Sequence, residues 1–103
     1  MSSSAFIVSA VRTPVGVGKP EKGALYPVAP VDLAAQVLSE ALLRGGLQPT
    51  HVDDVILGCV TPIGDQGANI GRLAALKAAF PVEVPGIQIN RMCGSGQQDV
   101  HFA

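Results

Sequence analysis

The sequence predicts an α/β fold in which strands and helices alternate along the chain as βαβαβ. An almost wholly apolar run at residues 5–11 and a continuous apolar run at residues 55–60 suit strands that are buried on both faces. Residues 87–90 alternate apolar and polar side chains. Between these runs, residues 30–44 and 69–80 have the features of helices. Strands that alternate with helices are joined by crossover connections, so we expect a parallel sheet with right-handed crossovers.

The composition limits the class of protein. The chain has 103 residues, which allows one small domain or a part of a larger one. Hydrophobic residues make up 48% and charged residues only 15%, which predicts extensive burial and argues against disorder. The net charge is -1 and no run of Lys or Arg occurs, so nucleic acid is not an expected partner. No apolar stretch approaches the ~20 residues of a membrane span, so no membrane partner is expected either.

The N-terminus and the cysteines predict a cytoplasmic protein. The first residues contain neither the basic region nor the apolar core of a signal peptide. Only two cysteines occur, Cys59 and Cys93, which is too few for a disulfide scaffold and lacks the close pairing of a zinc site. We therefore expect two reduced thiols and no metal.

The first predicted strand, Ala5 to Val11, is followed by a long loop from Thr13 to Pro30. This loop is rich in proline and glycine, which prevents regular structure. Gly16 to Lys19 suggests a phosphate-binding loop, but Pro20 follows the lysine and Pro14 stands where such a loop needs glycine. A plain connection is the better interpretation.

The first predicted helix, Pro30 to Arg44, has both ends marked. Pro30 suits a first helical position and Asp32 suits the positive first turn. Arg44 and the glycine pair at 45–46 suit the C-terminal end.

The next elements are a strand, a helix and a strand. Val55 to Val60 is the second predicted strand. The second helix, over residues 69–80, can be capped by Asn69 and stopped by Pro81. Ile87 to Asn90 is the third predicted strand, and residues 97–103 look like the start of another helix.

Cys93 lies directly after the third strand, in a glycine-containing turn before the last helix. A thiol at a helix N-terminus faces unpaired N–H groups that favour the nucleophilic thiolate, and Gly94 and Gly96 leave the approach open. The backbone N–H of Cys93 could also donate to a developing oxyanion. A small buried hydrophobe is the alternative interpretation of Cys93, and core packing is the interpretation for Cys59. Ser95 is a rival nucleophile, but the serine elbow needs glycines at positions 93 and 97.

Several segments in order carry a family resemblance. Asn90 to Gln98 (NRMCGSGQQ) resembles the nucleophile signature of the thiolases, which include acetyl-CoA acetyltransferases and 3-ketoacyl-CoA thiolases. Four further segments resemble thiolases in the expected order: Ile7–Gly16, Val55–Val60, Gly67–Arg72 and Val84–Asn90. Ketoacyl synthases and hydroxymethylglutaryl-CoA synthase are weaker matches.

The resemblance implies both a fold and a function. The chain would be the N-terminal portion of the thiolase N-terminal domain, an incomplete α/β/α layered unit ending after the nucleophile turn. Cys93 would attack a thioester to form an acyl-enzyme, with coenzyme A thioesters as substrates and no permanently bound cofactor. Thiolases act as dimers or tetramers, so a homo-oligomer is expected. A second cysteine and a histidine of the family lie beyond Ala103, so this chain alone is expected to be inactive.

Neither histidine in the chain is expected to replace the missing one. His101 is eight residues beyond Cys93, about 12 Å along a helix, which exceeds hydrogen-bond reach. His51 is expected at the surface. Asp99 departs from the family, which has a small residue at this position, and a buried unpaired carboxylate would be costly there.

A second interpretation comes from a different class of protein. The chain could be a small non-catalytic α/β association module in which Cys93 is structural. A downstream segment carrying histidine and cysteine in the same reading frame would decide between the two.

Overall fold

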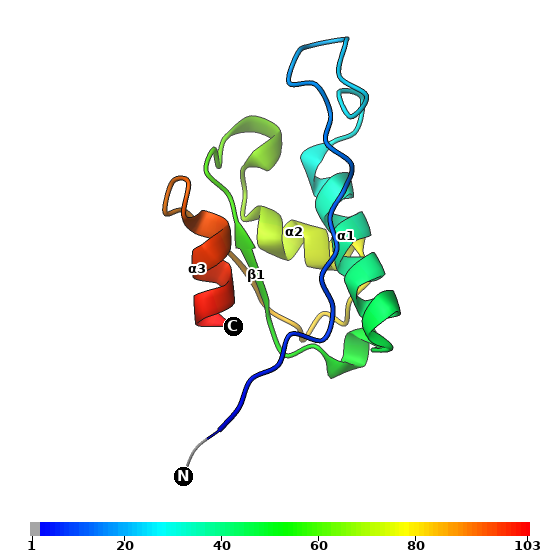
Figure 1. Ribbon diagram of the computed structural model, residues 1–103, viewed down its shortest axis with the longest axis vertical. Helices are drawn as coiled ribbons and strands as arrows, with labels where there is room; N and C mark the ends of the chain where they lie inside the picture. The colour runs from blue at the N-terminus through cyan, green and yellow to red at the C-terminus, as the bar shows by residue number, and fades with distance from the viewer. Residues whose placement is uncertain (1–2) are drawn as a thin grey trace.

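The computed structural model describes residues 3–103, in which helices surround a small parallel sheet (Figure 1). The elements are α1 (Pro30–Gly45), β1 (Val55–Gly58), α2 (Ile70–Lys77), β2 (Gly86–Ile89) and α3 (Ser95–Phe102), with short 3-10 turns at Pro49–His51 and Gly64–Gln66. The prediction of an α/β fold with a parallel sheet is confirmed.

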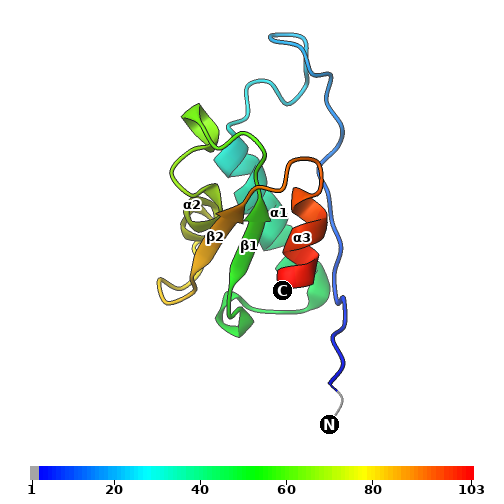
Figure 2. The same ribbon diagram turned by 90° about the vertical axis from the view of Figure 1, so that its left-hand side faces the viewer.

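The two strands lie between helices on both sides. β1 pairs in parallel with β2, with Val55 opposite Gly86 and Gly58 opposite Ile89. α3 lies on one side of β1, and α2 and α1 lie on the other, as Figures 1 and 2 show. The carboxyl ends of both strands point toward the turn that leads into α3 (Figure 2).

The core lies between the sheet and the two helices on its α2 side. Buried side chains from β1, α2 and the connection after α2 form one cluster: Val55, Ala75, Phe80 and Val84. Leu38 and Leu42 of α1 pack against this cluster. The apolar stripe of the first predicted helix therefore faces the core.

The prediction for α1 is confirmed at both ends. Pro30 is the first helical residue, Asp32 lies in the first turn and Arg44 in the last. Gly46 ends the helix in the left-handed conformation, at φ 69°, which glycine adopts without a steric penalty. Its N–H donates to carbonyls of the last turn of the helix.

The prediction for α2 is confirmed at its start and wrong at its end. The Asn69 side chain accepts a hydrogen bond from Arg72 N and donates to Gly86 O at 2.8 Å, so it caps the helix and ties it to β2. The helix ends at Lys77 and not at Phe80. Ala79 has a left-handed φ of 59°, and this reversal turns Phe80 into the core, where it is 5% exposed.

The predicted first strand, Ala5 to Val11, is wrong in this structure. Residues 3–17 contain no regular secondary structure, and Phe6 and Ile7 are 83% and 81% exposed. A strand exists only where a neighbouring chain segment completes its hydrogen-bond ladder, and no such pairing forms for this segment among residues 3–103. The segment instead runs along the outside of the molecule, with Ser9 near Gly45 at the end of α1.

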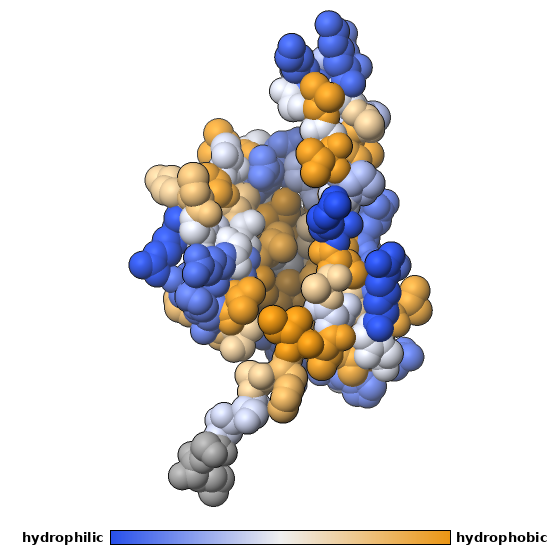
Figure 3. All heavy atoms as spheres, in the orientation of Figure 1, coloured by the Kyte–Doolittle hydropathy of each residue, from blue (hydrophilic) through white to orange (hydrophobic). Residues whose placement is uncertain are grey.

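The long loop after this segment projects away from the helices (Figure 1). Figure 3 shows hydrophobic side chains along the N-terminal segment and in the hollow beside it. No helix in the described part of the chain is both long and apolar enough to cross a bilayer.

Candidate active site

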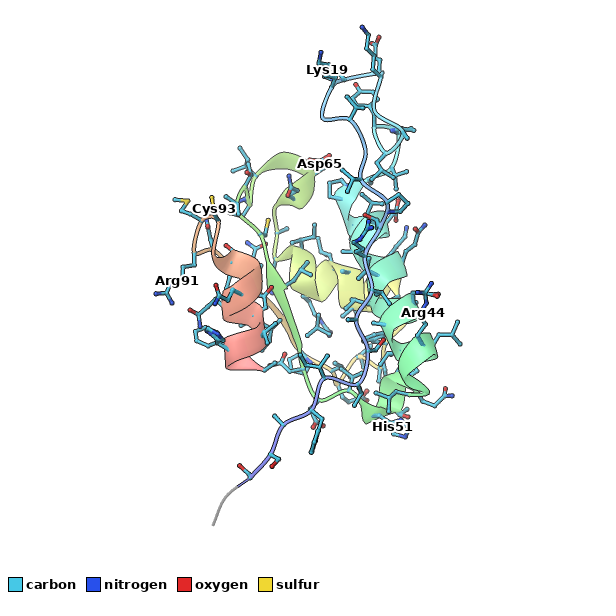
Figure 4. The ribbon with its side chains drawn as sticks, viewed as in Figure 1. Lys19, Arg44, His51, Asp65, Arg91 and Cys93 are labelled. Atoms are coloured by element: carbon cyan, nitrogen blue, oxygen red, sulfur yellow. The ribbon has the colours of Figure 1, made fainter. Side chains whose placement is uncertain are left out.

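Cys93 lies in the turn that joins β2 to α3, at the carboxyl ends of both strands (Figure 4). Its side chain is exposed, and Gly94 is the N-cap of α3. Ligands of open α/β sheets bind in this position, because loops at the carboxyl ends of the strands meet there. Because the thiol is exposed, the alternative prediction that Cys93 is a small buried hydrophobic residue is wrong.

The turn is tight and contains a strained residue. Gly94 N donates to Arg91 O at 3.0 Å, and Ser95 N donates to Met92 O at 3.1 Å. Met92 adopts a left-handed φ of 48°, which costs a non-glycine residue about 1–2 kcal/mol. Such a conformation persists only where surrounding contacts hold it in place.

Two side chains bind the backbone of this turn. The Ser95 hydroxyl donates to Met92 O at 2.7 Å and accepts from Arg91 N at 2.8 Å. Asn90 accepts from Met92 N at 2.9 Å and donates to Val60 O at 3.2 Å, beyond the end of β1. Ser95 is only 3% exposed, so the hydroxyl faces the turn and is not presented as a rival nucleophile.

Two backbone donors in the first turn of α3 are free within residues 3–103. Within the described residues, the N–H groups of Gly96 and Gln97 have no hydrogen-bond acceptor. These free donors carry the positive end of the helix dipole, which stabilises anions. A Cβ built on Gly96 would meet nothing within 4 Å, so the approach from this side is open. In the described part of the chain, the start of α3 therefore has two free donors and an open side.

Asp99 attaches α3 to β1. Its Oδ2 accepts a hydrogen bond from Gly58 N at 2.5 Å, while Oδ1 is buried without a partner. Gly58 permits this contact because a Cβ there would lie 2.9 Å from Oδ2 and 3.0 Å from Gly96 N. Desolvation by burial raises the pKa of Asp99 above its ordinary value, and the bond from Gly58 opposes that shift. The carboxylate that departs from the family pattern is therefore half-buried and paired through one of its two oxygens.

The two histidines and Cys59 form no hydrogen bond with Cys93 within the described residues. His51 lies at the far end of the molecule from Cys93 (Figure 4), where its Nδ1 accepts from Gln48 N at 3.0 Å. His101 is exposed near the end of α3. Cys59 is 5% exposed, with its Sγ 3.7 Å from Gln66 O, so its predicted core position is confirmed.

A polar groove lies beside the turn. It is lined by Arg91, Gly94, Gln97, Gln98 and His101. The Arg91 guanidinium donates to the Gln98 side chain and points away from Cys93 toward solvent (Figure 4). The groove places polar groups near the thiol without including it.

Sequence reasoning missed the two side chains that hold the turn, Asn90 and Ser95. Asn and Ser within a few residues of a turn often bind its backbone, and this was the available signal. Their partners could not be assigned from spacing alone, because the bonds depend on the left-handed conformation of Met92.

The comparison with protein families decides the classification. Residues 5–103 match the family described as thiolase, N-terminal domain. The chain belongs to the thiolase family.

Thiolases of several bacteria resemble the chain. It is 47% identical over 100 residues to a steroid 3-ketoacyl-CoA thiolase of Mycobacterium tuberculosis, covering 97% of this chain and 24% of that protein. It is 46% identical over 99 residues to a 3-ketoacyl-CoA thiolase of Bacillus subtilis, covering 96% of this chain and 25% of that protein.

A solved thiolase structure has the same fold. The acetyl-CoA acetyltransferase of Bacillus anthracis matches with a TM-score of 0.79 and 50% identity, over 89% of this chain and 22% of that one. The chain thus spans about a quarter of the length of the thiolases it matches.

Proposed function

We propose that Cys93 is the acyl-accepting nucleophile of a thiolase-type acyltransferase. The observation that carries the proposal is the position of an exposed thiol at the carboxyl ends of two parallel strands, immediately before the N-terminus of α3. The turn that holds this thiol is fixed by hydrogen bonds between the Ser95 side chain and the backbone of the turn. The relatives named as 3-ketoacyl-CoA thiolases and acetyl-CoA acetyltransferase support a coenzyme A thioester as the substrate.

The proposed first step in the synthetic direction transfers an acyl group from sulfur to sulfur. The Cys93 Sγ forms a bond to the carbonyl carbon of an acyl-CoA, and the bond from that carbon to the CoA sulfur breaks. The proton lost by Cys93 is taken up by the departing CoA thiolate, so the products are acyl-Cys93 and free CoA. Negative charge develops on the carbonyl oxygen during this step, and the backbone N–H of Cys93 is its proposed donor.

Other groups of the reaction are proposed to come from the rest of a complete thiolase. His51 is far from Cys93 and His101 lies about 12 Å along the helix, so neither serves as the base. We propose that residues 1–103 form the N-terminal portion of the N-terminal domain and do not turn over substrate alone.

Association and location are part of the same proposal. Exposed apolar side chains on the N-terminal segment, among them Phe6, Ile7 and Val15, suit a surface that other parts of the protein cover. We propose a homo-oligomer for the complete protein. Two free cysteines suit the reducing cytoplasm, which is the proposed location.

The test uses the full-length protein and acetyl-CoA labelled in its acetyl group. We expect one acetyl group per chain, bound to the peptide that contains Cys93, and none in a Cys93→Ala variant. Cys59→Ala is the matched control. It removes the other thiol, which is buried directly after β1, and should leave the labelling of Cys93 intact. Labelling of Cys93→Ala at the wild-type level would refute the proposal and favour the non-catalytic association module.

Thiol reactivity offers a second measurement. Limiting iodoacetamide should modify Cys93 well before Cys59, because Cys93 is exposed and Cys59 is buried. Equal modification of both thiols in the folded protein would contradict this expectation.

A further inference from the structure

Ser95 has an unusual position for a hydroxyl group next to an exposed cysteine. It is the first residue of α3 and is 3% exposed, although Met92 and Cys93, two other residues of the nucleophile turn, are exposed. Buried hydroxyl groups need hydrogen-bond partners, and here both partners are backbone groups of the turn itself.

The two bonds of the Ser95 hydroxyl hold both ends of the Arg91–Met92 dipeptide, which directly precedes Cys93. The hydroxyl accepts from Arg91 N at 2.8 Å and donates to Met92 O at 2.7 Å. Met92, between these two groups, is the residue in the strained left-handed conformation. The hydroxyl therefore offsets the strain of the backbone that sets the direction of Cys93.

The other contacts of the turn do not replace this one. Asn90 binds Met92 N and anchors the turn to Val60 O, but it does not reach the Met92 carbonyl or the Arg91 N–H. The backbone bond from Ser95 N to Met92 O, at 3.1 Å, is longer than the bond from the Ser95 hydroxyl. Without the hydroxyl, Arg91 N loses its acceptor and the Met92 carbonyl keeps only the bond from Ser95 N, so fewer contacts hold Met92 in its left-handed conformation.

We propose that Ser95 is a positioning residue for Cys93, holding the thiol at the orientation in which it attacks the acyl carbon. The inference rests on the proposed function of Cys93. Ser95 is not a catalytic residue in this proposal, because its hydroxyl is buried and donates its only proton to Met92 O. A misplacement of about 1 Å at a reacting atom lowers a rate by roughly 100-fold, so the effect of losing this hydroxyl should be large.

The experiment compares Ser95→Ala and Ser95→Thr in the full-length protein. Single-turnover acylation by labelled acetyl-CoA separates two quantities: the amplitude counts molecules with a competent Cys93, and the rate constant reports how well the thiol is placed. For Ser95→Ala we expect a rate constant 10- to 100-fold lower, with an amplitude near one per folded chain. Ser95→Thr keeps the hydroxyl and should recover most of the rate.

Ser39→Ala is the matched control. It makes the same one-atom change at an exposed serine of α1, which is remote from the turn in sequence and whose hydroxyl has no hydrogen-bond partner within residues 3–103. Its acylation rate and amplitude should equal those of the wild type. If Ser95→Ala does not stay folded, the measurement is made in trimethylamine N-oxide, which favours the compact state.

The outcomes distinguish the two proposals. A merely structural role for Ser95 predicts a lower amplitude with an unchanged rate constant, and that result would overturn the inference. An unchanged rate and amplitude in Ser95→Ala would overturn it as well. Failure of wild-type Cys93 to take up acetyl groups would instead refute the proposed function, before any Ser95 variant is compared.

Discussion

The nucleophile turn, residues 90–95, and the N-terminal segment, residues 3–17, differ in where the hydrogen-bond partners that order them come from. The turn holds a strained residue in place with hydrogen bonds from Asn90 and Ser95, most of them to groups within a few residues. The N-terminal segment is apolar and exposed, with Val15 at 91%, and no strand forms in it. A turn can be completed by its own side chains, whereas a strand needs a partner from elsewhere in the chain.

The largest effect expected from this comparison is that of Gly58→Ala. The added Cβ would lie about 3 Å from backbone atoms of Ser95 and Gly96, so α3 must move away from β1. Overpacking of this kind costs about 1–3 kcal/mol in the free energy of unfolding. Urea denaturation measures the loss.

Gly18→Ala in the long loop is the control, because a Cβ there meets nothing within 4 Å. Its free energy of unfolding should stay within about 0.5 kcal/mol of the wild-type value. Equal losses at both positions would contradict the close contact of α3 with β1.

A smaller effect is expected from Asn90→Ala. This change removes the acceptor of Met92 N and the bond to Val60 O, so the turn loses its anchor to the end of β1. Net hydrogen-bond contributions predict a loss of about 1 kcal/mol, measured by the same denaturation experiment. Gln36→Ala, an exposed amide on α1, is the control and should be nearly neutral. A neutral result for Asn90→Ala would mean that the turn does not depend on this side chain.

The pH dependence of Asp99 tests the attachment of α3. Its pKa in the folded protein is raised above 3.8 by desolvation, so the folded state binds this proton more tightly than the unfolded chain. The resulting stabilisation is present below the ordinary pKa and is lost as the pH rises through the folded value. The stability of the wild type relative to Asp99→Asn should therefore fall as the pH rises from about 4, and then level off. A difference that is constant with pH would contradict a raised pKa.

Asp99→Ala and Asp99→Asn should also differ at neutral pH. The asparagine keeps an oxygen that can accept from Gly58 N, whereas alanine leaves that N–H without its partner. We expect the alanine variant to have the lower melting temperature of the two, since an unpaired buried group costs about 1–3 kcal/mol. A higher melting temperature for alanine than for the wild type would show instead that the cost of burying the carboxylate exceeds the value of its hydrogen bond.

The smallest effect on stability is expected in the N-terminal segment. Ile7→Lys changes a side chain that is 81% exposed, so the free energy of unfolding should move by less than about 0.5 kcal/mol. Self-association should fall instead, because an unpaired apolar segment recruits other chains and a charge opposes this. Size-exclusion chromatography of the chain measures the change. Leu43→Lys, at a similarly exposed site on α1 (73%), should reduce association less. Equal effects would mean that exposed apolar area, and not the extended segment, drives association.

Elements whose signals are local were predictable from the sequence. The proline, aspartate, arginine and glycine signals of α1 lie within the helix or next to it, and both of its ends are confirmed. Asn69 caps α2 as its position predicted. The position of Cys93 before a helix followed from the adjoining residues alone, because a strand, a glycine-containing turn and a helix are each encoded nearby.

Contacts between distant segments decided the rest. Phe80 leaves the predicted helix to join Val55 and Val84 in the core, and residues 5–11 stay outside the sheet because no ladder partner forms for them. The sequence identified Asp99 as a departure from the family, but only the folded chain brings Gly58 N, which is 41 residues away, to its carboxylate. By sequence position Ser95 is a weak rival of Cys93, but in the folded chain its hydroxyl binds Arg91 N and Met92 O. Local sequence determines which backbone conformations are low in free energy for each segment. Only tertiary contacts determine which polar groups find hydrogen-bond partners and which apolar groups become buried.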